Sequence, residues 1–190
     1  YMGCSTFANH TVLPEIALAK AEIFEGVMRD GAVFLNADNE HCDLLMEKAK
    51  QTEIANVLLF GEKAGSQIHL KKVELTPQSS NIQASLFDEE ISFTLSVPGR
   101  HWVQNVLAIL GTVKQVGADI YKACDALGSM VAPSGRGATM TLNCEDGKFT
   151  VIDESYNASP IAMQAAFKVL GKMTPNNKGR RFAILGDMRE

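Results

Sequence analysis

Apolar and polar positions alternate with two different periods along the chain. Up to residue 60, amphipathic stretches of helical length take turns with short apolar runs. They predict helices at 13–30 and 40–51 and strands at 32–36 and 54–60. Strands and helices in alternation are typical of βαβ units, so we expect a parallel sheet and an α/β fold.

From residue 67 the apolar positions recur at every second residue. Three such stretches, separated by turn residues, predict strands at 67–75, 81–87 and 91–97. We expect these strands to form a small antiparallel sheet, because one face of each would be apolar and the other polar. Helical patterns follow at 101–117 and 119–130.

The stretch "VAPSGRGAT" at 131–139 is dense in Gly, Pro and Ser, and it is predicted to be a linker. Beyond it, apolar stretches on either side of the turn "EDGK" predict a hairpin. A helix at 160–173 and a strand at 180–186 complete the pattern. A boundary near 136–138 would divide the chain into domains at 1–137 and 138–190, with 1–12 either a cloning remnant or a divergent loop.

Composition narrows the function classes. The net charge is −4 and there is no basic run, which argues against a nucleic-acid surface. No apolar run approaches the roughly 20 residues that span a bilayer, so we expect no membrane insertion. The four cysteines are scattered without C-x-x-C spacing. We interpret them as reduced thiols of a cytoplasmic protein and expect no zinc site.

The stretch "VIDESYNASP" at 151–160 places two acids, an aromatic hydroxyl and an amide where a strand gives way to a helix. Open α/β sheets bind ligands at such junctions. Helix capping is the simpler explanation, since Ser159 before Pro160 fits an N-cap followed by the first helical position. Capping does not account for the polar residues that precede Ser159.

Lys20 has a similar ambiguity. It falls at helical spacing within an apolar stripe that includes Ile16, Ile23, Phe24 and Val27. A buried lysine has a lowered pKa, and its neutral amine can attack carbonyl carbon, including that of carbon dioxide. The alternative is a lysine at the edge of the stripe that extends its ammonium into water.

Five further polar residues each allow a structural and a functional interpretation. Asn36 and Asp38 follow a strand, where they would contact a nucleotide or form a turn and helix cap. His101 and Asn105 open a helix, whose N-terminus suits an anion or a polar ring edge. Arg136 lies between two glycines, where it would bind a phosphate or belong to a flexible linker.

Taken together, these stretches resemble the Mur ligases, the ATP-dependent amino-acid-adding enzymes of peptidoglycan synthesis. The matching pieces "AKAEIFEG", "LNADN", "PGRHWVQN", "GRG", "IDESYNASP" and "AILGDM" occur in family order. The resemblance covers about residues 13–190. It implies the later part of a central mononucleotide-binding ATPase domain with a small antiparallel sheet, followed by the start of a Rossmann-like C-terminal domain.

The resemblance also implies roles for single residues. Lys20 would be carbamylated and help to hold Mg²⁺. Asn105 and His101 would lie at the adenine of ATP, and Arg136 would reach ATP from the interdomain linker. Glu154 stands where most relatives have a nucleotide-contacting Asp, and the rest of that motif is completed by Tyr156 and Asn157.

"ESYNASP" followed by "LGDM" points within the family to the member that adds D-alanyl-D-alanine to UDP-N-acetylmuramoyl-tripeptide through an acyl phosphate. Two alternatives remain: another Mur-type or folylpolyglutamate-type ligase, and a non-catalytic domain that binds a nucleotide or a partner. No G-x-x-G-K-[ST] phosphate loop occurs in this stretch, so we expect it to be inactive alone and part of a longer chain. His10 fits the family's metal-binding histidine poorly.

Overall fold

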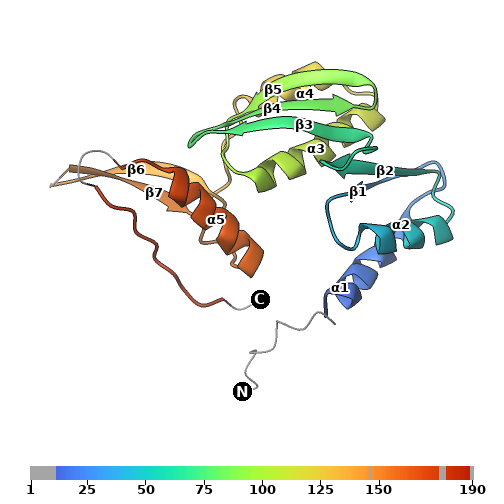
Figure 1. The fold of residues 1–190 in the computed structure, drawn as a ribbon, viewed down its shortest axis with the longest axis horizontal. Coiled ribbons are helices and arrows are strands. Elements are labelled where there is room, and N and C mark those ends of the chain that lie inside the picture. Colours follow the sequence, from blue (N-terminus) through green and yellow to red (C-terminus); the bar gives the residue numbers. More distant parts are fainter. Residues whose placement is uncertain (1–11, 146, 176–178, 189–190) are drawn as a thin grey trace. The chain divides into compact units, whose positions relative to one another are not determined.

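The computed structural model describes residues 12–145, 147–175 and 179–188 (Figure 1). The helices are α1 (Val12–Ala21), the short 3-10 helix η1 (Glu22–Gly26), α2 (Cys42–Gln51), α3 (Arg100–Gln115), α4 (Ile120–Leu127) and α5 (Pro160–Lys172). The strands are β1 (Ala32–Asn36), β2 (Asn56–Gly61), β3 (Ile68–Leu75), β4 (Ser80–Leu86), β5 (Glu89–Leu95), β6 (Ala138–Cys144) and β7 (Gly147–Asp153).

The first five strands form one sheet in the order β1-β2-β3-β4-β5. β1 and β2 are parallel along their length, from Ala32 opposite Asn56 to Asn36 opposite Phe60, with α2 as the crossover. This confirms the predicted βαβ unit. The connections from β3 to β4 and from β4 to β5 are too short for a parallel crossover, so these neighbouring strands must be antiparallel.

The predicted small antiparallel sheet is not separate from the parallel strands. β3 continues the sheet by pairing in parallel with β2, where Phe60 lies opposite Ile68 and Gly61 opposite His69. Sequence periodicity shows which face of a strand is apolar, but it does not show which strand lies beside it. The pairing is a tertiary feature that the pattern left open.

Two compact units can be distinguished. One holds the residues up to Lys72 together with 83–92 and 104–123; the other holds 73–82, 93–103 and the residues from Cys124 on. The first unit contains a core cluster between η1, β1, α2 and the residues that lead into β2, with Phe24, Val33, Leu35, Ala49 and Ile54 all buried. α3 approaches the sheet closely there, because a β-carbon at Gly111 would lie only 2.8 Å from Phe34 Cε1.

In the second unit, β6 and β7 pair as the predicted antiparallel hairpin, from Ala138 opposite Asp153 to Cys144 opposite Gly147. α5 follows, and Ser159 caps it by accepting a hydrogen bond from the Ala162 backbone N–H at 3.3 Å, with Pro160 at the first helical position. The predicted cap is therefore confirmed. None of the side chains of α5 is buried.

Two predicted elements differ from the structure. The first helix ends at Ala21 instead of continuing to residue 30, and η1 follows it. Residues 180–186 were predicted to be a strand, but they form none in the described part of the chain, and their apolar side chains lie at the surface, Ile184 at 99% exposed. A strand requires a neighbouring strand for its backbone hydrogen bonds, which local sequence does not reveal.

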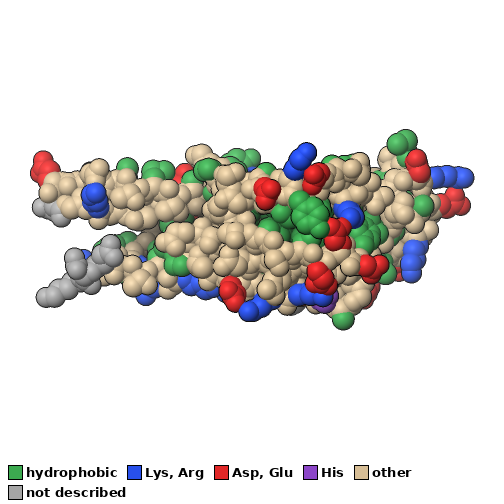
Figure 2. All heavy atoms as spheres, turned by 90° about the horizontal axis from the view of Figure 1, so that it is seen from above, with side chains coloured by type: hydrophobic (Ala, Val, Ile, Leu, Met, Phe, Trp, Pro, Cys, Tyr) green, Lys and Arg blue, Asp and Glu red, His purple; other side chains and the backbone are tan. Residues whose placement is uncertain are grey.

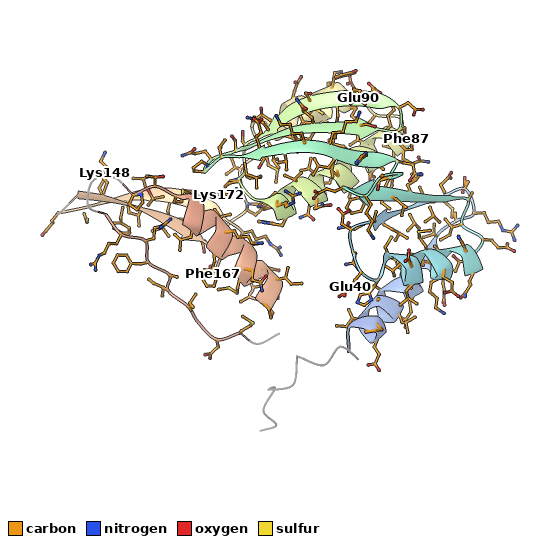
Figure 3. All side chains as sticks on the ribbon, viewed as in Figure 1. Glu40, Phe87, Glu90, Lys148, Phe167 and Lys172 are labelled. Carbon is orange, nitrogen blue, oxygen red and sulfur yellow. The ribbon has the colours of Figure 1, made fainter. Side chains whose placement is uncertain are left out.

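The surface and the thiols add little that is specific. Figure 2 shows acidic and basic side chains interspersed on the face that it presents. In Figure 3, Glu90 lies on β5, where it forms an ion pair with Lys71 of β3. Cys42, Cys124 and Cys144 form no disulfide with one another, and Cys4 lies outside the described residues. In the described ranges, every helix is too short or too polar to cross a bilayer.

Candidate functional site

The turn after β1 is built from the two polar residues that the sequence singled out. The side-chain oxygen of Asn36 accepts a hydrogen bond from the backbone N–H of Asp38 at 2.9 Å, and Ala37 N–H donates to the Phe60 carbonyl at 2.8 Å. Such an Asx turn is the structural alternative predicted for Asn36. It leaves nucleotide contact by Asn36 a prediction.

The carboxylate of Asp38 is occupied by internal hydrogen bonds. It accepts from the backbone N–H of Glu62, with distances of 3.0 and 2.8 Å to its two oxygens, and from that of Lys63 at 3.0 Å. A third donor, the side-chain amide of Gln104, lies at 3.0 Å. Gly61 allows this approach, because its φ is +137° and a β-carbon there would lie 2.5 Å from Asp38 Oδ2.

The first turns of α3 present the two predicted adenine residues on one side of the helix. His101 and Asn105 are four residues apart, and both are exposed. Although its side chain stays exposed, the protein atoms around the ring remove water from it and lower the pKa of His101. A neutral imidazole has one donor and one acceptor nitrogen, which suits a purine edge.

A cavity of about 320 Å³ lies beside His101. Its lining comes from the β3–β4 turn, the residues that open α3, and α5. The lining includes the basic side chains of Arg100, Lys168 and Lys172; Lys172 is labelled on α5 in Figure 3. The cavity gives a ligand with an apolar body and an anionic group room next to His101.

The Gly-rich linker is held against the end of β7 by backbone hydrogen bonds. Gly135 N–H donates to the Asp153 side chain at 3.0 Å, and Gly137 N–H donates to the Asp153 carbonyl at 2.8 Å. Tyr156 N–H donates back to the Gly135 carbonyl at 3.1 Å. The flexible linker suggested by the sequence is thus pinned on both sides of Arg136.

Asp153 is the centre of this arrangement. Besides Gly135 it accepts the backbone N–H of Ser155 at 3.1 Å. Hydrogen bonds from the Ser155 side chain and backbone and from Gly135 hold the pKa of the Asp153 carboxyl below its usual range. Donors that satisfy the charged form act in this direction. Asp153 therefore orients the chain around Arg136 and Glu154.

The polar side chains of the linker and of "ESYN" gather next to Asp153. The Arg136 guanidinium lies over the Tyr156 ring, 4.1 Å from its centroid. A β-carbon at Gly137 would lie 3.3 Å from Glu154 Oε1 and 4.0 Å from Trp102 Nε1. Partial burial, followed by the neighbouring charge of Asp153, raises the pKa of Glu154. Asn157 lies one residue beyond Tyr156 and is exposed.

Lys20 does not lie where its stripe predicted. The buried face of α1 and η1 is made by Ala17, Ala21 and Phe24, and both Lys20 and Ile16 are exposed. The helix ends at Ala21, so the spacing assumed for residues beyond it does not hold. The burial argument for a reactive Lys20 is wrong, and the carbamate rests on the resemblance alone. His10 lies outside the described residues.

Metal chemistry has little support in the described ranges. Within them, no three His, Cys, Asp or Glu side chains lie together as a metal site would require. With Lys20 exposed, these residues do not by themselves fit Mg²⁺.

Three residues of the site were missed by sequence reasoning. Asp153 and Gln104 act through hydrogen bonds across 18 and 66 positions of the chain, which no local pattern reveals. The sequence pattern gave Trp102 no role in the site, yet its indole Nε1 would lie 4.0 Å from a β-carbon at Gly137. A signal did exist for Asp153, because a carboxylate at the end of a strand commonly accepts backbone N–H groups of the following turn.

Comparison with known proteins gives a consistent picture. The Mur ligase middle domain matches residues 7–113, which is more than half of the chain. A curated relative from Rickettsia prowazekii, UDP-N-acetylmuramoyl-tripeptide–D-alanyl-D-alanine ligase, is 28% identical over 94% of this chain and 38% of its own length.

Solved structures agree. MurF from Acinetobacter baumannii is similar with a TM-score of 0.73 and 26% identity, over 85% of this chain and 34% of that one. The fold is also that of MurF ligase from Thermotoga maritima in complex with ADP, with a TM-score of 0.67 and 22% identity. That match covers 85% of this chain and 35% of the Thermotoga chain. The chain thus spans between a third and two fifths of the length of these relatives. With the middle-domain match over more than half its residues, this chain belongs to the Mur ligase family.

Proposed function

We propose that this chain is part of an ATP-dependent ligase that joins D-alanyl-D-alanine to UDP-N-acetylmuramoyl-tripeptide in the cytoplasm. In that reaction ATP supplies the phosphoryl group that activates the tripeptide carboxylate as an acyl phosphate, from which the dipeptide amine forms the amide bond. The support is family membership, the curated relative that carries this activity in its name, and a fold shared with an ADP complex.

The observation that carries the proposal is the cluster around Asp153. In it, Arg136 precedes Gly137 in the linker that is bonded to Asp153, and Glu154 Oε1 would lie 3.3 Å from a β-carbon at Gly137. Arginine matches the geometry of phosphate oxygens, and a carboxylate accepts hydrogen bonds from ribose hydroxyls. Stacking on Tyr156 limits the conformations of Arg136 before a nucleotide binds.

The remaining candidates extend this assignment. His101 and Asn105 are proposed at the adenine, and the partly buried Glu154 at the ribose, with Tyr156 and Asn157 completing the motif. Asn36, the last residue of β1, is proposed as a further nucleotide contact. Lys20, as a carbamate, would contribute one ligand to Mg²⁺, whose other ligands would have to come from outside the described residues.

The test is steady-state kinetics of the full-length protein against ATP, with D-alanyl-D-alanine and the UDP-sugar tripeptide. A charge-assisted hydrogen bond contributes about 1.5–3 kcal/mol, so Glu154→Ala should lower kcat/KM for ATP by about ten- to a hundredfold. Arg136→Lys should also lower it, because an ammonium cannot reproduce a bidentate fork.

Lys148→Arg is a matched control, since it replaces one exposed cation by another on β7, at the end of the hairpin away from Asp153. Unchanged kinetics in both Glu154→Ala and Arg136→Lys would remove "ESYN" from the nucleotide site. Turnover only with a single amino acid, in place of D-alanyl-D-alanine, would assign the protein to another ligase of the family. Absence of turnover with every amine would favour a non-catalytic nucleotide-binding role.

A further inference from the structure

The carboxylate of Asp38 accepts several hydrogen bonds from other parts of the protein. Its two oxygens accept from two successive backbone N–H groups, those of Glu62 and Lys63, and from the Gln104 amide. Successive backbone N–H groups form a concave site for an anion, and here that site is filled by a side chain of the protein itself. The turn after β1, the loop after β2 and the helix α3 therefore meet at one carboxylate.

The hydrogen bond to Asp38 determines the orientation of the Gln104 side-chain amide. A carboxylate can only accept, so the Gln104 amide must turn its NH₂ group toward Asp38. As a result Gln104 Oε1 is buried without a hydrogen-bond partner among the described residues. An unsatisfied buried acceptor is costly, and a glutamine free to rotate would not keep one. The bond to Asp38 therefore holds Gln104 in place.

Gln104 lies in the part of α3 that matters for the nucleotide. It immediately precedes Asn105, and the exposed side of this helical turn carries the proposed adenine contact. A hydrogen bond that fixes Gln104 toward the loop after β2 also fixes the rotation of α3 about its axis. It thereby fixes the direction in which Asn105 projects.

We propose that Asp38 is a positioning residue, which orients the nucleotide-binding side of α3 through Gln104 and does not itself contact the nucleotide. This inference rests on the proposed function of α3 as part of a nucleotide site. It replaces the direct nucleotide contact expected for Asp38 from the sequence. Gly61 is required for the same arrangement, because the β-carbon of any larger residue would push the Asp38 carboxylate away from its hydrogen-bond donors.

The test is a double-mutant cycle in the full-length protein, with the dissociation constant for ADP measured by calorimetry. Asp38→Asn replaces one accepting oxygen by a donor, and Gln104→Met removes the amide while keeping the length of the side chain. Each single variant should weaken ADP binding by about five- to tenfold. The double variant should bind ADP no more weakly than the single variants, because both break the same bond.

Gln115→Met is the matched control, since it makes the same change at an exposed position at the end of α3 and should leave ADP binding unchanged. In kinetic measurements, Asp38→Asn and Gln104→Met should raise KM for ATP more than they lower kcat. A loss of about a hundredfold or more in Asp38→Asn, with ADP binding of Gln104→Met unchanged, would make Asp38 a direct ligand and overturn the proposal.

Two further outcomes separate this inference from the proposed function. If Asp38→Asn and Gln104→Met both melt at lower temperature yet bind ADP as the wild type does, the hydrogen bond between Asp38 and Gln104 only stabilises the fold. The positioning role is then wrong. If the wild-type protein binds no ADP, the proposed nucleotide site fails, and the positioning role falls with it. Only the first of these leaves the ligase assignment intact.

Discussion

The chain up to Cys124 and the stretch 125–188 contain similar proportions of apolar residues, but these residues are buried to different degrees. All of the buried apolar side chains among the described residues lie at or before Cys124. In 125–188 none of the described apolar side chains is buried, and many of the large ones are exposed; Phe167 is labelled in Figure 3. The large hydrophobic side chains exposed there are Val131, Met140, Leu142, Phe149, Tyr156, Ile161, Phe167, Phe182, Ile184, Leu185 and Met188.

This difference shows what holds the candidate site. Before Cys124 the burial of side chains stabilises the fold, and polar groups such as Asp38 serve to connect packed elements. In the later stretch, backbone hydrogen bonds to Asp153 and a left-handed glycine fix the linker, while Arg136 and Tyr156 stay exposed. Changes in the first region should therefore cost stability, and changes in the second should mainly affect the local arrangement and ligand binding.

The largest expected effect tests the first half of this comparison. Leu107 of α3 is fully buried, so Leu107→Ala should lower the free energy of unfolding by about 2–5 kcal/mol. Ile161 of α5 is 81% exposed, and Ile161→Ala should change it by less than about 0.5 kcal/mol. Urea unfolding of the two variants and the wild type measures both. An equal loss from Ile161→Ala would mean that α5 buries its apolar side in solution, and the comparison would be wrong.

The next effect is smaller and concerns two glycines of the later stretch. Gly135 has φ +75°, and a β-carbon there would lie 2.9 Å from both Tyr156 N and Tyr156 Cβ. Gly135→Ala should therefore lower the free energy of unfolding by about 1–3 kcal/mol. Gly171 in α5 has open space around it, so Gly171→Ala should be neutral or stabilise by up to about 1 kcal/mol.

The protein contains a probe of this arrangement in its single tryptophan. Trp102 Nε1 lies 4.0 Å from the position of a β-carbon at Gly137. Displacement of the linker in Gly135→Ala should change the hydration of the indole and shift its fluorescence emission, whereas Gly171→Ala should not. Emission that stays at the wild-type wavelength in Gly135→Ala, with unfolding also unchanged, would show that the linker tolerates a side chain and is not pinned.

Particular residues show how far the sequence could predict this molecule. Sequence patterns sufficed for the βαβ unit, the hairpin and the Ser159 cap, because each is formed by elements that follow one another directly in the chain. They failed for Lys20, because the helix ended one residue later and the stripe was continued past its end. They failed for the strand at 180–186, since strands need partners. The nucleotide contacts of Arg136, Glu154 and Asn105 stay predictions.

The clearest limit concerns residues whose role is set by a distant donor. Asp38 lies two residues beyond β1 and Asp153 is the last residue of β7, and both positions would also suit a ligand-binding carboxylate. The structure assigns their oxygens to backbone N–H groups at 62–63 and at 135 and 155. Glu154, one residue beyond Asp153, accepts no such set of donors among the described hydrogen bonds and keeps its charge only against partial burial.

The smallest expected effect uses that contrast between adjacent carboxyl groups. Because burial raises the pKa of Glu154 above its usual 4.5, the folded protein binds this proton more readily than the unfolded chain. The resulting stability is present at low pH and is lost as pH rises from about 4.5 through the raised pKa. Glu154→Gln removes the cost of burying the charge, so its Tm at pH 7 should exceed that of the wild type by about 1–2 °C, with no difference below pH 4.5.

Asp153→Asn should show the opposite sign, since the lowered pKa of Asp153 contributes stability above about pH 3.8 that is lost as pH falls. Thermal unfolding from pH 3.5 to 8, with ADP binding measured in parallel, separates the two. A more stable Glu154→Gln that binds ADP less tightly would show that this carboxylate is kept for its ligand and not for the fold. A less stable Glu154→Gln at pH 7 would instead mean that Glu154 has a cationic or N–H partner, and the distinction between the two acids would disappear.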